Sequence, residues 1–330
     1  MCTSTRCALR TYTGGGVLRA WIRSRPVPEP ATTSARGARQ RWLAAMPIAF
    51  VLLWSTGFIV AKYAAPHAPP LTFLLYRFAG IVALLLPMIW ASGAPWPRGP
   101  LQWLHVAVAG VLLQAVYLGG VWYAIAQGMP AGVSALIVGA QPLLTALLGF
   151  AVGERASLRQ WAGLALGFAG IALVLSDRLT LAGAGWHATA VNVLALVGIT
   201  AGTLYQKKFC GPVDLRTGSV IQFGASFALL LPFALVTETL RVNYTPEFWL
   251  ALAWAVVGLS LVAISLLLAM IRRGRATEVA SLMYLTPPVT ALMAWTWFGE
   301  RLAPLAWLGV FVTIAGVALV LKNKRVGNRP

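Results

Sequence analysis

Arg77 is the one strongly charged residue well inside an apolar stretch of this sequence, residues 71–91. An arginine at the centre of a membrane-spanning helix costs about 2.5–3.5 kcal/mol on insertion scales, so such a residue usually faces a cavity or a partner. A carboxylate would be the natural ligand of a guanidinium in a cavity. The long side chain could instead extend to the membrane surface. The sequence leaves both interpretations open.

Prolines mark two other apolar stretches, Pro142 in residues 131–152 and the pair Pro287-Pro288 in residues 277–298. A proline in a helix removes a backbone donor and frees a carbonyl about four residues earlier. In a membrane, that carbonyl needs a partner or a water-filled cavity. Interrupted helices at matched positions predict a binding site at mid-depth. A simple packing kink is the alternative interpretation.

Other polar and aromatic residues are expected at a similar depth, and together with these they form a candidate substrate-binding set. An aromatic lining with a few amides suits a small amphipathic solute. Each residue alone is also explained by contacts between helices or by an interfacial position, so the prediction rests on the combination. The set is Arg77, Trp54, Tyr117, Gln141, Pro142, Gln222, Tyr284, Thr286 and Pro288.

Groups that catalyse reactions or bind metals are scattered along the chain. Hydrolysis or group transfer needs such groups clustered at one depth, and the three histidines lie at the ends of separate apolar stretches. The three cysteines lack the CxxC spacing of metal sites. We therefore predict no catalytic residue, no metal site and no cofactor, and a protein that is not an enzyme.

The apolar stretches themselves indicate a polytopic membrane protein. The chain has 330 residues, of which 59% are hydrophobic and 10% charged, with a mean hydropathy of +0.76. A membrane-spanning helix needs about 20 mostly apolar residues. The sequence predicts an all-α fold with ten such spans, at residues 43–62, 71–91, 103–126, 131–152, 159–176, 187–206, 218–237, 248–270, 277–298 and 305–321.

The net charge of +18 is distributed in a way that predicts orientation. With the N-terminus in the cytoplasm, 21 of the 26 Lys and Arg fall on the cytoplasmic side of the ten predicted spans, as the positive-inside rule requires. Both termini are then cytoplasmic. Because the basic residues are spread over loops, nucleic-acid binding is not predicted. Residues 1–42 are expected to be a disordered basic tail, with a transit peptide as the alternative, and residues 322–330 a basic C-terminal tail.

Residues 43–176 and 188–321 read as two copies of one unit. Adding 145 or 146 to a position in the first copy gives its partner in the second. The matches among rarer residues are Pro142 with Pro288, Gly153-Glu154-Arg155 with Gly299-Glu300-Arg301, Trp161 with Trp307, Gly163 with Gly309, and Gly170 with Gly316. An odd number of spans in each copy would place the second copy upside down in the membrane, and inverted repeats of this kind build many transporters.

The repeat also sorts residues into scaffold and candidate function. Arg77 is matched by Gln222, so the scaffold does not require the charge. Glu154 and Glu300 recur in both copies and are expected to cap a following helix or pair locally. The glycines of residues 159–176 and 305–321 predict helices that pack closely or dimerise. A homodimer is therefore left open.

The sequence resembles the EamA-type transporters of the drug/metabolite transporter superfamily over residues 43–322. The likeness is carried by Trp54-Ser55-Thr56-Gly57-Phe58 through Lys62, by Arg77-Phe78, and by the repeated Gly-Glu-Arg pattern with its following Trp and Gly residues. Ser55 and Thr56 depart slightly from the family pattern. The resemblance implies ten helices in two inverted halves and movement of small metabolites, often outward, across the bacterial inner membrane.

Together these features predict a secondary transporter, in this interpretation an exporter, of small amino-acid-like or amphipathic metabolites. Transport would proceed by alternating access between the two inverted five-helix repeats. The expected partners are a small-molecule substrate and the lipid bilayer. No acidic residue lies at the centre of a predicted span to serve as a proton relay. A passive channel or scaffold without alternating access is the alternative.

Overall fold

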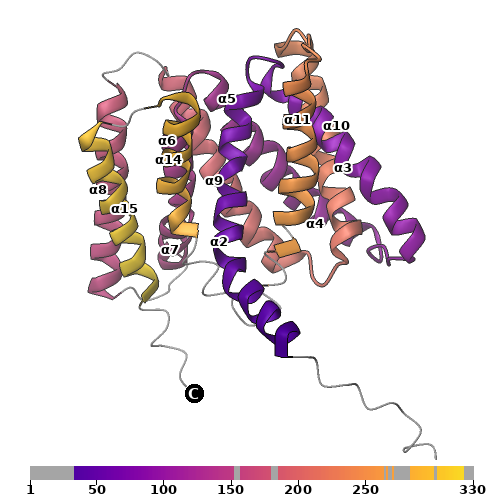
Figure 1. Ribbon diagram of the computed structural model, residues 1–330, viewed down its shortest axis with the longest axis horizontal. Helices are drawn as coiled ribbons and strands as arrows, with labels where there is room; N and C mark the ends of the chain where they lie inside the picture. The colour runs from indigo at the N-terminus through magenta and orange to yellow at the C-terminus, as the bar shows by residue number, and fades with distance from the viewer. Residues whose placement is uncertain are drawn as a thin grey trace, which may run out of the picture. The chain divides into compact units, whose positions relative to one another are not determined.

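The computed structural model describes residues 33–151, 157–179, 185–263, 265–266, 270, 283–300 and 303–322. The chain forms two compact units, Met1–Ala45 and Met46–Pro330, and the packing below concerns the second. Every regular element in the described residues is a helix (Figure 1). The predicted all-helical character is confirmed for this part of the chain.

The helices follow the order of the predicted spans, and several spans are built from two consecutive segments. In the first half they are α2 (Thr33–Ala64), α3 (Pro70–Ser92), α4 (Pro100–Gly110), the π-helical η1 (Val111–Val116), α5 (Tyr117–Ala126), α6 (Ala131–Gly139), α7 (Gln141–Ala151) and α8 (Leu158–Leu179). In the second half they are α9 (Trp186–Phe209), α10 (Leu215–Thr237), α11 (Pro246–Ala253), the π-helical η2 (Trp254–Ala263), the 3₁₀ turn η3 (Met283–Leu285), α14 (Thr286–Phe298) and α15 (Pro304–Lys322).

Seven helical runs in the described residues are long and apolar enough to cross a membrane: Ala45–Ala64, Pro70–Ser92, Pro100–Ala126, Ala131–Leu148, Trp186–Phe209, Leu215–Thr237 and Pro246–Ala263. Two shorter apolar helices, Leu158–Leu173 and Pro304–Leu319, fall on the predicted fifth and tenth spans. The predicted ninth span lies partly outside the described residues. The total of ten spans stays a prediction.

The first helix extends into the segment that was assigned from the sequence to the N-terminal tail. α2 begins at Thr33, so residues 33–42 are helical in the structure. The physical reason is composition, because this segment contains Ala, Arg and Gln, which favour helix, and its first proline is Pro47.

α8 and α15 lie side by side and pack through a face of small residues (Figure 1). A Cβ atom on Gly170 would lie 2.6 Å from the backbone oxygen of Gly309, and one on Gly316 would lie 2.6 Å from that of Gly163. Adding 146 to 163 and 170 gives 309 and 316, so each contact maps onto the other when the two halves are exchanged. Because these faces are already covered within one chain, a homodimer would have to use another surface.

α3 and α10 form a second contact with the same property. The rings of Phe78 and Phe223 lie with their centroids 5.4 Å apart, and both side chains are buried. Their positions differ by 145, so this contact maps onto itself under exchange of the halves. A two-fold relation between two structural units places equivalent residues in contact at its axis.

The π-helical segments also occupy matched positions. Adding 145 to residues 111–116 of η1 gives 256–261, which lies within η2. Such segments widen a helix locally and are frequent at functional sites. The two halves thus share an irregularity in addition to their regular helices.

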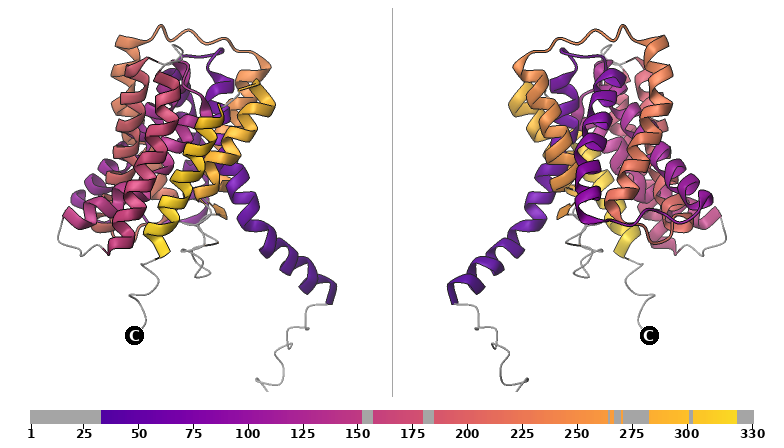
Figure 2. Two further views of the ribbon diagram at one scale, coloured as in Figure 1. Left: turned by 90° about the vertical axis from the view of Figure 1, so that its left-hand side faces the viewer. Right: turned by 90° about the vertical axis from the view of Figure 1, so that its right-hand side faces the viewer.

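The N-terminus of α3 is capped by a carboxylate from the other half of the chain. The backbone N–H groups of Leu71 and Thr72 donate to the two oxygens of Glu238 at 2.8 and 2.7 Å, and the Thr72 hydroxyl donates at 2.6 Å. Glu238 begins the extended connection between α10 and α11, which crosses one end of the helices (Figure 2). A carboxylate at this position satisfies donors that the helix leaves unpaired.

We expect Glu238→Ala to lower the free energy of unfolding by about 1.5–3 kcal/mol, because hydrogen bonds to a charged acceptor are lost. Glu238→Gln should have an intermediate effect, since one acceptor oxygen remains. Thr237→Ala is the control, because the Thr237 hydroxyl bonds only within its own helix, to the carbonyl of Phe233. Thermal unfolding of the detergent-solubilised protein measures the effect, and equal loss in Glu238→Ala and Thr237→Ala would contradict the capping role.

Candidate functional site

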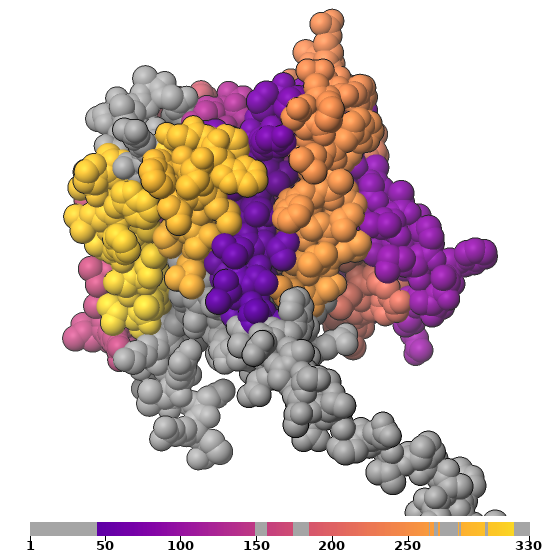
Figure 3. All heavy atoms as spheres, viewed as in Figure 1, coloured from indigo at the N-terminus to yellow at the C-terminus, as the bar shows by residue number. Residues whose placement is uncertain are grey.

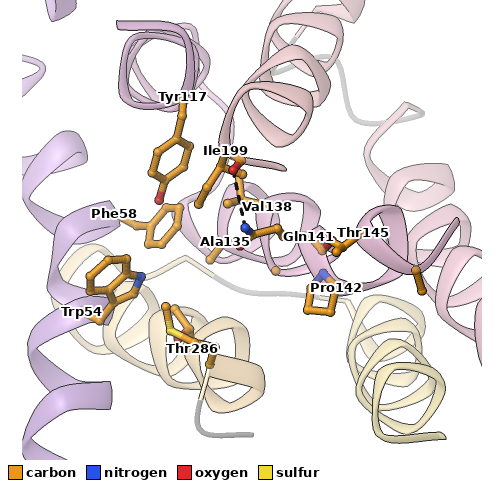
Figure 4. Close-up of a pocket in the computed structure, with 13 residues that line it drawn as sticks. Trp54, Phe58, Tyr117, Ala135, Val138, Gln141, Pro142, Thr145, Ile199 and Thr286 are labelled. Atoms are coloured by element: carbon orange, nitrogen blue, oxygen red, sulfur yellow. Dashed lines mark hydrogen bonds between the residues drawn. The ribbon is translucent and has the colours of Figure 1, made fainter. Parts of the chain in front are cut away.

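A cavity of about 250 Å³ lies between α2, α5, α6, α7, α9 and the start of α14 (Figure 4). We call it the first cavity. Its lining includes five of the nine residues of the predicted binding set: Trp54, Tyr117, Gln141, Pro142 and Thr286. These residues come from both halves of the chain and converge on one space.

The helix interruptions lie at this cavity. α6 ends at Gly139 and α7 starts at Gln141, and in the second half α14 starts at Thr286, which is 145 positions after Gln141. A Cβ atom on Gly139 would lie 3.1 Å from the ring of Pro287, so the two interruptions are in contact. The matched breaks therefore bring irregular backbone from both halves to one place.

The prolines act here as residues that begin a helix. Pro142 is the second residue of α7, and Pro287 and Pro288 lie in the first turn of α14. At such positions the missing N–H has no helical partner to lose, so a proline is tolerated and fixes the local backbone. The 3₁₀ turn η3 precedes α14, whereas Ala140 alone separates α6 from α7.

The polar groups of the first cavity are few. Gln141 donates from Nε2 to Thr203 Oγ1 at 3.0 Å and to the carbonyl of Ile199 at 3.5 Å. Thr286 is buried, and its hydroxyl has no hydrogen-bond partner among the described residues. Its hydroxyl and the aromatic rings of Trp54 and Tyr117 suit a small solute with apolar and polar parts.

Arg77 lies in α3, is buried with 6% of its surface exposed, and does not line the first cavity. Its Nη2 donates to Ser260 Oγ at 3.2 Å, and Ser260 in turn donates to the carbonyl of Ala255 at 3.0 Å. The Nε atom of Arg77 has no partner among the described residues. The guanidinium therefore does not extend to the membrane surface. Of the two interpretations drawn from the sequence, a position facing a cavity or a partner is the one that remains.

Two other members of the predicted set lie elsewhere, and the side chain of a third is not described. Gln222 donates weakly to Gln206 at 3.5 Å, and its backbone packs against Gly110. Pro288 is half-buried in α14 and is not in the lining of the first cavity. The side chain of Tyr284 lies outside the described residues. Gln222 and Pro288 thus lie outside the lining of the first cavity, because matching depth along a helix does not determine which face a side chain takes.

Several lining residues were missed by sequence reasoning. They are Phe58, Ala135, Val138, Gly139, Thr145, Ala146, Ile199 and Met283. Most are apolar or small residues in apolar helices, where one cavity-facing residue looks like any other buried residue. Thr145 is the exception, because it lies one turn after Gln141 on the same helix face and its hydroxyl bonds the Gln141 carbonyl at 2.8 Å.

An ion pair joins two of the helices that line the first cavity. Lys62, in the last turn of α2, pairs with Glu300, just after α14, and the Lys62 ammonium also lies 5.1 Å from the ring centroid of Phe298. Glu300 was expected from the sequence to cap a helix or pair locally, and its partner among the described residues is Lys62, 238 positions away. α2 lies between α14 and α11 on the face shown in Figure 3, and Trp254 donates to Thr56 on its other side at 2.9 Å.

Comparison with known proteins agrees with this geometry. The sequence pattern described as "EamA-like transporter family" matches the chain twice, at residues 41–176 and 188–322. The chain belongs to this family. The predicted family resemblance is confirmed, and the EamA-like protein is a membrane transporter and not an enzyme, as the sequence indicated.

Curated relatives cover most of the EamA-like chain. "Uncharacterized inner membrane transporter YedA" of Escherichia coli K12 is 29% identical over 280 residues, which is 84% of this chain and 89% of that protein. "Probable amino-acid metabolite efflux pump" of the same organism is 26% identical and covers 84% and 86%. A solved crystal structure, 21% identical, covers 86% of this chain and 98% of that chain with a TM-score of 0.60, which shows a shared fold.

Proposed function

We propose that this EamA-like protein exports small amphipathic, amino-acid-like metabolites across the bacterial inner membrane by alternating access between two inverted repeats. The observation that carries the proposal is the first cavity, which is lined from both halves at the matched helix interruptions. Substrate sites of inverted-repeat transporters lie at such interrupted helices near the membrane midplane. A relative named as a probable amino-acid metabolite efflux pump supports the class of solute.

The exchangeable contacts support the repeat arrangement. Each of three features maps onto its own counterpart in the other half when 145 or 146 is added: the contact between α8 and α15, the Phe78–Phe223 contact and the π-helical segments. The two repeats can exchange their conformations because they are similar. A state open to one side of the membrane therefore has a counterpart open to the other side. In the proposed orientation both termini are cytoplasmic, and the Lys62–Glu300 pair holds α2 and α14 together beyond the outer end of the cavity.

Cysteine accessibility tests whether the first cavity is the solute pathway. In a background where Cys2, Cys7 and Cys210 are serine, Gln141→Cys and Thr286→Cys should react with a membrane-impermeant thiol reagent, because a pathway is hydrated from at least one side. Leu148→Cys is the control on the same helix, because Leu148 is 42% exposed yet does not line the cavity. Modification of Leu148→Cys alone would contradict the proposal.

Counterflow distinguishes a carrier from the alternative of a passive channel or scaffold. Proteoliposomes loaded with unlabelled solute should accumulate labelled solute transiently against its gradient if the protein alternates between two states. A channel equilibrates the label without accumulation, and a scaffold does not move it. Candidate solutes are found by testing which toxic amino-acid analogues are better tolerated by cells that overproduce the protein.

A further inference from the structure

The guanidinium of Arg77 is buried without a negatively charged partner among the described residues. The one hydrogen bond that it makes within the described residues goes to the neutral hydroxyl of Ser260, although a guanidinium has five N–H donors. Burying an unpaired charge costs several kcal/mol even after the surroundings relax. An arginine in this condition is retained when an anion compensates it in at least one functional state.

Ser260 holds the guanidinium from one side. The Ser260 hydroxyl donates its own hydrogen to the carbonyl of Ala255, five positions earlier in the π-helical η2, and so offers its lone pairs to Arg77. Ser260 accepts one of the two hydrogens of Nη2, and the neighbouring Nε has no partner among the described residues. A carboxylate binds a guanidinium edge of this kind with two parallel hydrogen bonds.

Arg77 also stands between two cavities. Ser260 lines a second cavity of about 410 Å³ between α3, the start of α10 and η2. On the other side, Tyr117 lines the first cavity and lies near the Arg77 side chain. A single side chain would therefore separate the Arg77 guanidinium from a solute in either cavity: Ser260 in the second cavity and Tyr117 in the first.

The acid of the second cavity is already compensated. Asp214 lines this cavity, but Arg216 donates to both of its carboxylate oxygens, at 3.1 Å from Nε and 3.0 Å from Nη2. These hydrogen bonds hold the pKa of Asp214 below its usual range, so Asp214 stays ionised and paired with Arg216 at neutral pH. Asp214 therefore does not compensate the charge of Arg77, which has no acidic partner in the part of the chain that the structure describes.

The repeat shows that the scaffold does not need this pair. The positions equivalent to Arg77 and Ser260 are Gln222 and Ala115, so neither the charge nor its hydroxyl partner recurs in the other half. Residues that maintain the fold, such as Gly170 and Gly316 or Phe78 and Phe223, do recur. The asymmetry is expected of a residue that recognises a ligand bound once per chain.

We propose that the free edge of the Arg77 guanidinium binds the carboxylate of the transported solute, so that the cargo is an amphipathic carboxylate or a zwitterion that carries one. This inference rests on the proposed export function and names the chemical class of its substrate. Ser260 is a positioning residue that orients the guanidinium, and the apolar and aromatic lining of the cavities accepts the rest of the solute.

Binding of benzoate, compared with the uncharged benzamide of the same size, tests the site without any need to know the natural cargo. We expect titration calorimetry on purified wild-type protein to detect benzoate, and Arg77→Gln to weaken it at least tenfold. Arg77→Lys should keep part of the affinity, and Ser260→Ala should weaken benzoate less than Arg77→Gln does. Arg241→Gln is the control for binding to an exposed arginine, because Arg241 lines neither cavity, and it should leave benzoate binding unchanged.

The possible outcomes distinguish a loss of carboxylate binding from a loss of folding and from a failure of the proposed export function. Arg77→Gln should unfold at the wild-type temperature or above it, because a buried unpaired charge is removed. If Arg77→Gln does not fold, the test uses the benzoate affinities of Arg77→Lys and Ser260→Ala. Wild-type benzoate affinity in both of these variants overturns the proposal. Equal affinity for benzoate and benzamide in the wild type, or tighter binding of inorganic phosphate, also overturns it. Loss of counterflow with benzoate binding intact would contradict the export function alone.

Discussion

Replacing Gly170 with alanine should destabilise the EamA-like protein by about 1–3 kcal/mol, the range found when a close-packed interior is forced to accept extra atoms. The added Cβ would meet the backbone oxygen of Gly309 at 2.6 Å. Backbone cannot move aside as a flexible side chain can, so α8 and α15 would have to separate along the face they share. Thermal unfolding in detergent micelles measures the loss.

Two comparisons make this result specific. Gly224→Ala in α10 is the control, because nothing lies within 4 Å of the added Cβ, and alanine there should be neutral or stabilising by up to about 1 kcal/mol. Gly316→Ala should match Gly170→Ala, because its Cβ would meet the oxygen of Gly163 at the same distance. The double variant should lose less than the sum, since either change already separates the same helices. Full additivity would contradict a shared contact.

Replacing Thr145 with tryptophan should abolish transport, with a fall of roughly tenfold or more in the initial rate of solute exchange, because the indole would fill space that a solute needs. Thr145 lines the first cavity on α7, one turn after Gln141. The fold should tolerate the change, since the side chain enters a cavity and not a packed interior. Counterflow in proteoliposomes measures the rate.

Leu148→Trp provides the matched control on the same helix. Leu148 is 42% exposed and is not among the residues that line the cavity, so the larger side chain should leave transport within about twofold of the wild type. Both variants should unfold at similar temperatures. Normal exchange in Thr145→Trp, or equal loss in the two variants, would exclude the first cavity as the pathway.

The candidate site could be predicted from sequence where a residue type carries its own physical signal. Pro142 and the Pro287-Pro288 pair marked the interruptions because proline cannot occupy a helix interior without cost. Arg77 was conspicuous because a charge in an apolar stretch requires an explanation. Gln141 and Thr286 were found through the prolines beside them. These signals are local, so they can be read without knowing which helices are neighbours.

Other parts of the site depended on contacts that no local pattern encodes. Glu300 was expected to pair nearby, and its partner is Lys62 on another helix. Gln222 was matched to Arg77 by the repeat, yet it packs at Gly110 outside the cavity. A residue 145 positions from a functional one shares its depth, but the face it presents depends on which helices surround it.

The sequence by itself determined that this is an all-helical membrane protein of the EamA-like family, because hydropathy, charge distribution and the rarer residues of the repeat are properties of the chain. Tertiary structure alone decided which faces of those helices meet. It separated Arg77 from the first cavity and placed it against Ser260, and it covered the glycine faces of α8 and α15 with each other. The physical reason is that a helix in a uniformly apolar sequence has no polar face to orient it, so its rotation is set by packing against its neighbours.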